Sequence, residues 1–303
     1  MATKRVQMSS YFEARIRELE RAGRFSTSRN YRYTWDSFRQ FLRGKPLWID
    51  QVSAPLIARY NSWLFKNGLM RNSVSFYNRV LRALYNRAVR EGYARQTHPF
   101  AEVYTGVDTT RKRALPAETL RKIASLDLPE PELALARDLF LFSFQARGMS
   151  FVDMAYLTSK NLKGDTLQYS RRKTGQRIEV RVEPYMQDIL KRWKKETTKP
   201  YLLPIIRSHD PKKAHAQYTS ALCAHNRNLR KIGEMVELTF PLSSYFARHS
   251  WATVARDAHI PISVISSGLG HTSERTTQIY LAQLSNEIID SANRQVWDAL
   301  GLR

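Results

Sequence analysis

Cysteine is nearly absent from this 303-residue chain, which contains only Cys223. One cysteine cannot form an internal disulfide, and the sequence has no cluster of cysteine and histidine with the spacing of a structural zinc site. We therefore expect neither a disulfide framework nor a bound zinc ion. Cys223 itself is expected to be a small buried residue or an incidental one.

Long apolar runs are absent as well. No stretch approaches the roughly 20 apolar residues that a transmembrane helix needs, and the first ten residues are polar. We expect an intracellular, cytoplasmic protein without a membrane partner.

Acidic residues are few: the chain has 27 Asp and Glu against 49 Lys and Arg, a formal net charge of +22. A surface with this excess of positive charge repels itself unless a polyanion neutralises it, so nucleic acid is the expected partner. The carboxylates are too scattered to indicate a two-metal site, which argues against a metal-dependent nuclease. We expect no metal and no other cofactor.

The apolar fraction of 43% is enough for a hydrophobic core, and the length favours two domains. The first hundred residues contain four amphipathic helical patterns. The first begins with a capping box at Ser10 and Glu13, the second carries an aromatic stripe over residues 31–42, the third follows Ser53, and the fourth opens at Ser73. These patterns predict a small helical bundle.

Basic side chains of the fourth helical pattern are candidates for DNA contacts. They are Arg79, Arg82 and Arg87. Arginine can bind base edges in the major groove, whereas a solvated cationic face is the alternative for any one of them.

Residues 104–113 break the helical periodicity with polar and basic residues, as an interdomain linker does. We place an N-terminal domain at residues 1–107, the linker at 108–113 and a second domain at 114–303. The linker ends in three basic residues, Arg111, Lys112 and Arg113. Three such charges can follow a phosphate backbone or belong to an ordinary solvated loop.

The second domain combines helical patterns with one segment of strand periodicity. Helical patterns begin at Ala117 and cover residues 132–144, and apolar residues alternate with polar ones between residues 167 and 182. This alternation predicts a β-hairpin with Lys173 in its turn. The fold class is therefore expected to be mainly α with a small β-hairpin or sheet.

Five residues of the second half have the chemistry of a phosphoryl-transfer site. In order, they are Arg147, Lys173, Arg248, His271 and Tyr280. The planar fork of arginine can bind two phosphate oxygens, lysine and histidine can move protons, and a tyrosine in a cationic pocket can act as a nucleophile. Each residue has an ordinary structural explanation when taken alone, and it is their order and spacing that favour a common site.

Three of these residues, Arg248, His271 and Tyr280, lie in segments that resemble the catalytic box of the tyrosine recombinase (phage integrase) family. The segments are Arg248-His249-Ser250-Trp251-Ala252-Thr253, Leu269-Gly270-His271 and Thr276-Thr277-Gln278-Ile279-Tyr280. The helical N-terminal part resembles the core-binding, SAM-like domain of that family, so the resemblance covers nearly the whole chain. The motif from Arg147 to Asp153 is similar to that of integrases and invertases from Bacteroidetes mobile elements.

The resemblance implies a site-specific DNA recombinase that forms a 3′-phosphotyrosine at Tyr280 without metal or ATP. It implies that Arg147 and Arg248 hold the phosphate and that Lys173 protonates the leaving oxygen. It also implies that Asp153 supports the pocket. The expected partners are double-stranded DNA recombination sites, other copies of the chain in a homotetramer on DNA, and accessory DNA-bending or directionality factors. A bacterial, nucleoid-associated protein for integration, excision or inversion of DNA is expected.

One position departs from the family pattern, because Tyr245 stands where histidine is usual. On a helix Tyr245, Arg248 and His249 share a face at i, i+3 and i+4. We expect Tyr245 to support phosphate binding and His249 to support the pocket, leaving His271 and Lys173 to move protons. A type IB topoisomerase-like enzyme and a DNA-binding regulator that has lost catalysis remain alternative functions.

The end of the chain carries another apolar stripe at helical spacing. It comprises Ile288, Ile289, Ala292, Val296 and Leu300, with Trp297 beside it. The stripe can pack within its own domain or dock into a neighbouring copy of the chain.

Overall fold

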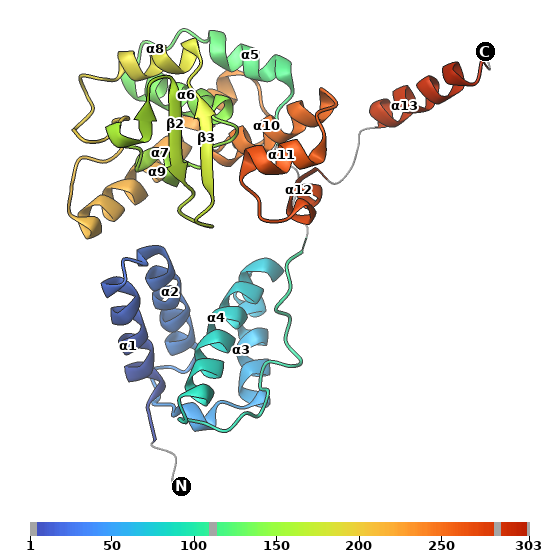
Figure 1. Cartoon of the computed structure of the whole chain (residues 1–303). Coiled ribbons are helices and arrows are strands. Elements are labelled where there is room, and N and C mark those ends of the chain that lie inside the picture. Colours follow the sequence, from blue (N-terminus) through green and yellow to red (C-terminus); the bar gives the residue numbers. More distant parts are fainter. Residues whose placement is uncertain (1–4, 109–113, 282–285, 302–303) are drawn as a thin grey trace. The chain divides into compact units, whose positions relative to one another are not determined.

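The computed structural model describes residues 5–108, 114–281 and 286–301, without the side chains of residues 279, 280 and 286–292. The chain divides into two compact units, Met1–Thr110 and Arg111–Arg303. Both are mainly helical, and the second contains a small antiparallel sheet (Figure 1). The predicted fold class, mainly α with a small sheet, is confirmed. No helix in the described residues is long and apolar enough to cross a lipid bilayer.

The described part of the first unit contains four α-helices. They are α1 (Met8–Arg21), α2 (Phe25–Phe41), α3 (Ala54–Lys66) and α4 (Arg71–Arg90), with the short 3₁₀ helix η1 (Ile49–Gln51) before α3. Their apolar faces enclose an aromatic core in which Phe12, Phe38 and Tyr60 are fully buried. Phe12 stacks on Trp35, and the ring of Phe38 meets that of Tyr60 edge to face. This aromatic core joins all four helices.

Long-range packing moves the start of α1 away from the position that the sequence predicts. The predicted helix start with a capping box at Ser10 and Glu13 is wrong, because α1 already begins at Met8. Met8 is buried in the core, and its backbone N–H donates to Leu47 O at 2.9 Å. Ser10 Oγ lies in the first turn and donates to Gln7 O.

Residues 104–108 lie against one face of α4. Ser75 Oγ donates to Gly106 O at 2.5 Å, and Asn78 Nδ2 donates to Tyr104 O at 3.3 Å. Asn72 accepts from the backbone N–H of Asp108 at 2.8 Å and donates to Asp108 O at 3.2 Å. We call residues 104–108 the strap; it belongs structurally to the first unit.

The second unit contains most of the secondary structure of the chain. Its helices are α5 (Ala117–Ser125), α6 (Pro131–Gln145), α7 (Phe151–Ala155), η2 (Ser159–Asn161), α8 (Pro184–Arg192), α9 (Pro211–Met235), α10 (Tyr245–Asp257), α11 (Ile262–Leu269), α12 (Glu274–Leu281) and α13 (Asn286–Ala299). Helix α6 is apolar on most faces, which suits a helix at the centre of a domain. It packs against α8, α9 and α10.

The sheet has three strands in the order β1 (Leu162–Lys163), β2 (Thr166–Ser170) and β3 (Arg177–Arg181). Leu167 pairs with Val180 and Tyr169 with Ile178, and all four side chains are buried. The predicted hairpin is β2–β3, and the two-residue strand β1 is an addition to it.

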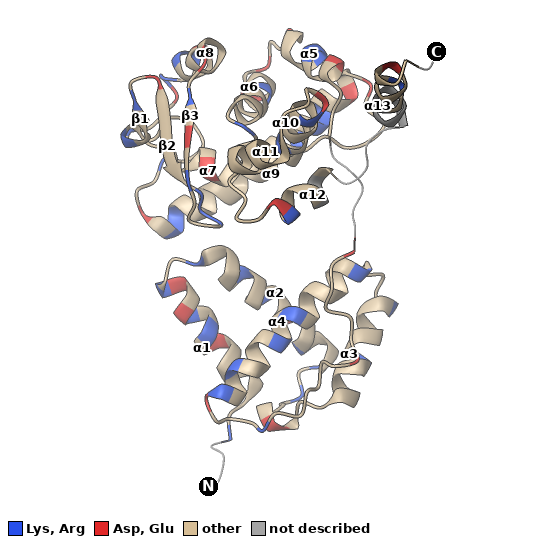
Figure 2. Cartoon of the chain, turned by 45° about the vertical axis from the view of Figure 1, so that its right-hand side comes forward, with Lys and Arg blue, Asp and Glu red and all other residues tan. Residues whose placement is uncertain are grey.

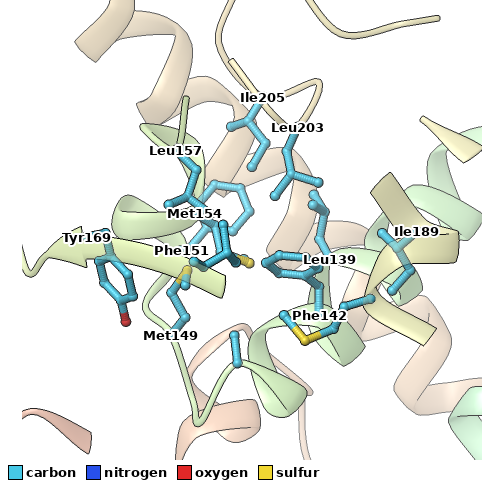
Figure 3. Close-up of a cluster of buried hydrophobic side chains, with 14 of the residues drawn as sticks. Leu139, Phe142, Met149, Phe151, Met154, Leu157, Tyr169, Ile189, Leu203 and Ile205 are labelled. Atoms are coloured by element: carbon cyan, nitrogen blue, oxygen red, sulfur yellow. The ribbon is translucent and has the colours of Figure 1, made fainter. Parts of the chain in front are cut away.

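One buried cluster connects the sheet to the helices of this unit. Its residues include Phe142 of α6, Met154 of α7 and Ile189 of α8 (Figure 3). Tyr169 lies at the edge of the cluster and turns its hydroxyl away from it (Figure 3). The charges of Asp153, Arg248, Arg171 and Arg147 act on this hydroxyl. Cys223 lies on α9 and is exposed, so of the two alternatives expected for it the buried one is excluded.

Candidate active site

Arg248 on α10 is the centre of a polar cluster in the second unit. Its side chain is 4% exposed, and its Nη1 donates to Gly148 O at 2.8 Å. Its Nη2 donates to Leu269 O and contacts His271 Nε2 at 3.2 Å. A buried guanidinium is tolerated only when its donors are matched in this way.

The residues between α6 and α7 approach Arg248 so closely that position 148 has no room for a side chain. Arg147 and Gly148 follow α6 with φ of 57° and 68°. A Cβ atom on Gly148 would lie 2.7 Å from Arg248 Cα. The positive φ and this close approach bring the Arg147–Gly148 turn directly onto α10.

Burial and the charges on this turn and on α10 affect the pKa of Tyr169. Burial raises the pKa of the Tyr169 hydroxyl and the Asp153 carboxylate raises it further, while the charges of Arg248, Arg171 and Arg147 oppose the rise. Arg147 is half-buried. The charges of the two arginines predicted to hold a phosphate therefore both act on the Tyr169 hydroxyl.

His271 is held as a neutral imidazole. Burial lowers the pKa of His271 to about 4, and the charges of Arg248, Arg171 and Lys173 lower it as well. Because arginine has only donors, His271 Nε2 accepts in its contact with Arg248, and Nδ1–H donates to Thr277 Oγ1 at 2.8 Å. The lone pair at Nε2 is available to accept a proton when the Arg248 contact is exchanged.

The hairpin turn presents Lys173 beside this cluster. The backbone N–H of Arg171 donates to Gln176 O at 2.8 Å and closes the turn, so Lys173 is exposed at its tip. Its charge acts on His271. The position at the tip is the one that the sequence predicts.

Asp153 of α7 fixes the beginning of the same turn. It is 4% exposed, and its Oδ1 accepts from the backbone N–H of Arg172 at 2.9 Å while its Oδ2 accepts from Ser150 Oγ at 2.7 Å. The carboxylate therefore ties the turn that carries Lys173 to the helix that follows the Arg147 turn.

Tyr245 and His249 lie on α10 next to the cluster. Tyr245 is the first residue of α10 and is 43% exposed, and its ring meets that of His249 edge to face at 4.8 Å. Tyr280 lies on α12, three residues beyond Thr277, and its side chain lies outside the described residues.

The candidate DNA-contact residues of α4 have different surroundings. Arg79 is exposed, whereas Arg82 Nη1 donates to Thr105 Oγ1 of the strap at 2.9 Å. Arg87 forms ion pairs with Glu91 at 2.6 Å and with Glu18 at 3.0 Å. Arg111, Lys112 and Arg113 lie outside the described residues.

Sequence reasoning missed two residues of the cluster. Arg171 is 7% exposed, and its Nη1 donates to Gly270 O at 2.7 Å. Thr277 is fully buried and bonds to His271. The sequence offers one signal for Thr277, its position in the same short segment as Tyr280, and none that separates Arg171 from the basic residues after it.

The cluster has the charge pattern of a phosphate site. Arg147, Arg171, Lys173 and Arg248 supply positive charge, and Asp153 supplies negative charge. Such an excess favours an oxyanion, and forked guanidinium donors suit one with several oxygens. Among the described residues, no group of three or more His, Cys, Asp or Glu side chains is placed to hold a metal ion.

Two family models match the chain. The model described as the phage integrase SAM-like domain matches residues 7–103, and the model described as the phage integrase family matches residues 132–287. No curated protein sequence matches the chain.

Solved structures share the fold at low sequence identity. The Tn1549 transposon integrase in complex with a circular intermediate DNA is 16% identical, with a TM-score of 0.67, and the match covers 95% of this chain and 98% of that one. A lambda integrase dimer bound to a COC′ core site is 17% identical, with a TM-score of 0.64 and coverage of 91% and 95%. A lambda integrase tetramer bound to a Holliday junction is 16% identical, with a TM-score of 0.62 and coverage of 91% and 78%.

Proposed function

The chain belongs to the phage integrase family and is a site-specific tyrosine recombinase, and we propose that the cluster around Arg248 is its active site. The observation that carries this assignment is the contact set of Arg248, whose guanidinium joins the Arg147–Gly148 turn, the end of α11 and His271. One residue thus brings together three of the segments that carry the motif.

Tyr280 is the proposed nucleophile. Its Oη attacks the scissile phosphorus, the bond from phosphorus to the 5′ oxygen breaks, and a 3′-phosphotyrosine forms. Residues three apart on a helix share a face, so Tyr280 is expected on the side of α12 that carries Thr277, the hydrogen-bond partner of His271. Strand rejoining reverses these steps with a new 5′ hydroxyl and uses no ATP.

Proton transfer is assigned to His271 and Lys173. Neutral His271 can accept the Tyr280 proton at Nε2, and Lys173 at the exposed tip of the turn can donate a proton to the departing 5′ oxygen. Tyr245 has no imidazole and is assigned to phosphate binding through its hydroxyl, with His249 supporting its ring. Asp153 is assigned to support of the turn.

Arg147 and Arg248 are assigned to the non-bridging phosphate oxygens. Negative charge grows on these oxygens in the transition state, and a preorganised guanidinium stabilises it without having to reorient. Removal of one such donor typically slows a reaction by about 10²- to 10³-fold. Replacement of Arg147 should therefore affect cleavage more than DNA binding.

Double-stranded DNA is the proposed partner of both domains, with boundaries at residues 1–107 and 114–303. Lys and Arg recur on helices of both units (Figure 2), and the similar integrase structures include complexes with DNA. Phosphate contacts should dominate the affinity. The basic residues Arg79 and Arg111 to Arg113 are the candidates for such contacts.

A homotetramer on DNA is the proposed active assembly. Val296 and Trp297 of α13 and Leu300 directly after it are each more than half exposed, and a stripe of large apolar side chains favours docking into another copy. The similar lambda integrase dimer and tetramer support this proposal. Integration, excision or inversion of a mobile DNA element, with accessory DNA-bending or directionality factors, is the proposed role.

Covalent capture of DNA tests the proposed function. The protein is mixed with fragmented DNA in EDTA, denatured with SDS and examined for protein-linked DNA, with Tyr280→Phe in parallel. We expect adducts from the wild type and none from the variant, and sequencing of the attached ends would identify the recombination site. Tight DNA binding without any adduct on intact or nicked DNA would instead favour a non-catalytic regulator.

A further inference from the structure

Two buried arginines hold consecutive carbonyl groups directly before His271. Arg248 of α10 donates to Leu269 O, and Arg171 of the hairpin donates to Gly270 O at 2.7 Å. These carbonyls lie at the C-terminal end of α11, where a helix lacks backbone donors and carries partial negative charge. The hairpin and α10 therefore both bind the backbone of Leu269 and Gly270, the two residues directly before His271.

Glycine at position 270 allows this contact. Gly270 has φ of 63°, and the backbone N–H of His271 bonds back to Ser266 O at 3.0 Å, which ends α11 in a left-handed turn. A Cβ atom on Gly270 would lie 2.5 Å from Ile178 Cδ1 and 2.8 Å from Arg171 Cδ. The hairpin and the end of α11 are thus in direct van der Waals contact.

Arg171 joins this contact to the turn that carries Lys173. Its backbone N–H and C=O bond to Gln176 O and to the N–H of Gly175, while its side chain bonds to Gly270. Its Nε is buried without a hydrogen-bond partner among the described residues. An arginine in this position costs desolvation that an apolar side chain would avoid, which indicates a use for its charge and its donors.

We propose that Arg171 is a positioning residue of the recombination reaction, which links the turn bearing Lys173 to the end of α11 and thereby fixes His271 relative to Lys173. This rests on the proposed function, in which both residues move protons. Arg171 acts through His271 and Lys173, and its buried side chain does not contact DNA itself. Misplacing a reacting group by about 1 Å can slow a reaction on the order of 10²-fold.

Arg171→Met tests the proposal, because methionine fills similar space without charge or donors. Arg171→Lys keeps the charge, and Arg172→Met is the matched control. Arg172 is exposed, its guanidinium lies 3.8 Å from the centre of the Tyr156 ring, and it is not among the charges that act on His271. The DNA is the fragment recovered from wild-type adducts. Adduct formation by Arg171→Met should be about 10²-fold slower at unchanged DNA affinity, with partial rescue in Arg171→Lys.

A second measurement does not depend on activity. The charged groups that act on His271 are Arg248 from α10 and Arg171 and Lys173 from the hairpin. Because Arg171→Met removes one of these charges, the pKa of His271 should rise in that variant. NMR titration of the ring C–H signal of His271 measures this pKa, and the signal is assigned by its absence from the spectrum of His271→Asn. Arg171→Lys and Arg172→Met should leave that pKa close to the wild-type value.

Each result decides the proposal. Wild-type adduct rates in folded Arg171→Met, or an unchanged His271 titration, would overturn it. If Arg171→Met does not fold, Gly270→Ala separates the hairpin from α11 while every charge is kept, and undiminished adduct formation in that variant would also overturn it. A wild type that forms no adduct refutes the proposed function instead, and the NMR titration then still shows whether Arg171 acts on His271.

Discussion

Gly148 shows how much a single residue of the site depends on the fold around it. Its positive φ turns the chain after α6, and its missing Cβ lets the backbone approach Arg248 Cα. The positive φ disfavours a side chain at this position, and the close approach to Arg248 leaves no room for a Cβ atom. The position of Arg147 relative to Arg248 therefore depends on the glycine between α6 and α7.

Replacement of Gly148 by alanine should separate the two arginines. A non-glycine residue at positive φ costs on the order of 1–3 kcal/mol, and the new Cβ would also collide with Arg248 Cα. We expect adduct formation to fall by about 10²-fold, while DNA affinity changes little. Gel-shift binding and SDS-resistant adducts measure the two effects.

Gly164→Ala is the control for backbone strain. Gly164 has φ of 59°, and a Cβ there would meet nothing within 4 Å. Equal loss of adducts in both alanine variants would show that strain alone, and not the contact with Arg248, explains the effect.

The burial of His225 should make the stability of the second unit depend on pH. It is 4% exposed, stacks on Phe151 at 4.7 Å, and has no hydrogen-bond partner at either ring nitrogen among the described residues. Burial lowers the pKa of His225 to about 3. Between that value and about 6.5 the unfolded chain binds a proton that the folded chain excludes, so stability falls as the pH falls through this window.

The expected loss is about 1.4 kcal/mol of unfolding free energy for each pH unit below about 6, from His225 alone. Urea unfolding of the wild type and of His225→Phe between pH 7 and pH 5 measures it. The variant should lose less stability over this range, although the half-buried His271 contributes in the same direction to both proteins. Parallel pH profiles would contradict the assigned role of His225.

At the scale of the elements, local sequence signals determine some boundaries of helices and strands, and long-range packing determines others. Helix α3 was predictable because Ser53 and Pro55 mark its start and Asn67–Gly68 its end. The hairpin was predictable because apolar and polar residues alternate along it. The start of α1 was not, because Met8 is fixed by a bond to Leu47 that no local pattern contains.

The same division applies to the candidate site. The motif residues are recognisable by their order and spacing, but Arg171, Arg172 and Lys173 are three consecutive basic residues in the sequence. Folding buries the first, leaves the last exposed at the turn and stacks Arg172 on Tyr156. The contact of the hairpin with the end of α11 distinguishes Arg171, and the contact with Tyr156 distinguishes Arg172.

The strap on α4 begins where the helical periodicity of the sequence ends, and only its last residue, Asp108, falls in the predicted linker 108–113. If its hydrogen bonds to α4 are stable, Asn72→Ala should release the backbone N–H of Asp108. One hydrogen bond contributes about 1 kcal/mol, so amide exchange at Asp108 should become about fivefold faster. NMR-detected hydrogen exchange measures this rate.

Ser73→Ala is the matched control, because Ser73 is an exposed neighbour on the same helix. Unchanged exchange at Asp108 in Asn72→Ala would show that the strap does not depend on this pair of bonds.

For the molecule as a whole, the net charge of +22 includes arginines that are paired with carboxylates and arginines that are exposed. Some arginines are already neutralised within the chain, as Arg87 is by Glu18 and Glu91. The pKa of Glu18 is lowered first by the hydrogen bond from Arg15 and then by that from Arg87. The pKa of Glu91 is lowered first by the hydrogen bond from Tyr11 and also by that from Arg87. Other arginines, such as Arg79, are exposed on the same helix as Arg87. Only the second kind can release counterions from DNA without first breaking an ion pair.

Replacement of Arg79 and replacement of Arg87 should therefore have different effects on the salt dependence of DNA binding. Each neutralised phosphate adds about −0.9 to the slope of log affinity against log salt concentration. If Arg79 contacts a phosphate, Arg79→Ala should make the slope less steep by about one unit. Arg87→Ala should leave the slope unchanged and lower thermal stability, because it breaks the ion pair that joins α4 to Glu18 of α1 and the pair with Glu91 at the end of α4. Fluorescence anisotropy with one DNA duplex at several salt concentrations gives the slopes. A slope change in Arg87→Ala equal to that in Arg79→Ala would mean that DNA displaces the ion pairs, and the charges of α4 would then have to be counted together.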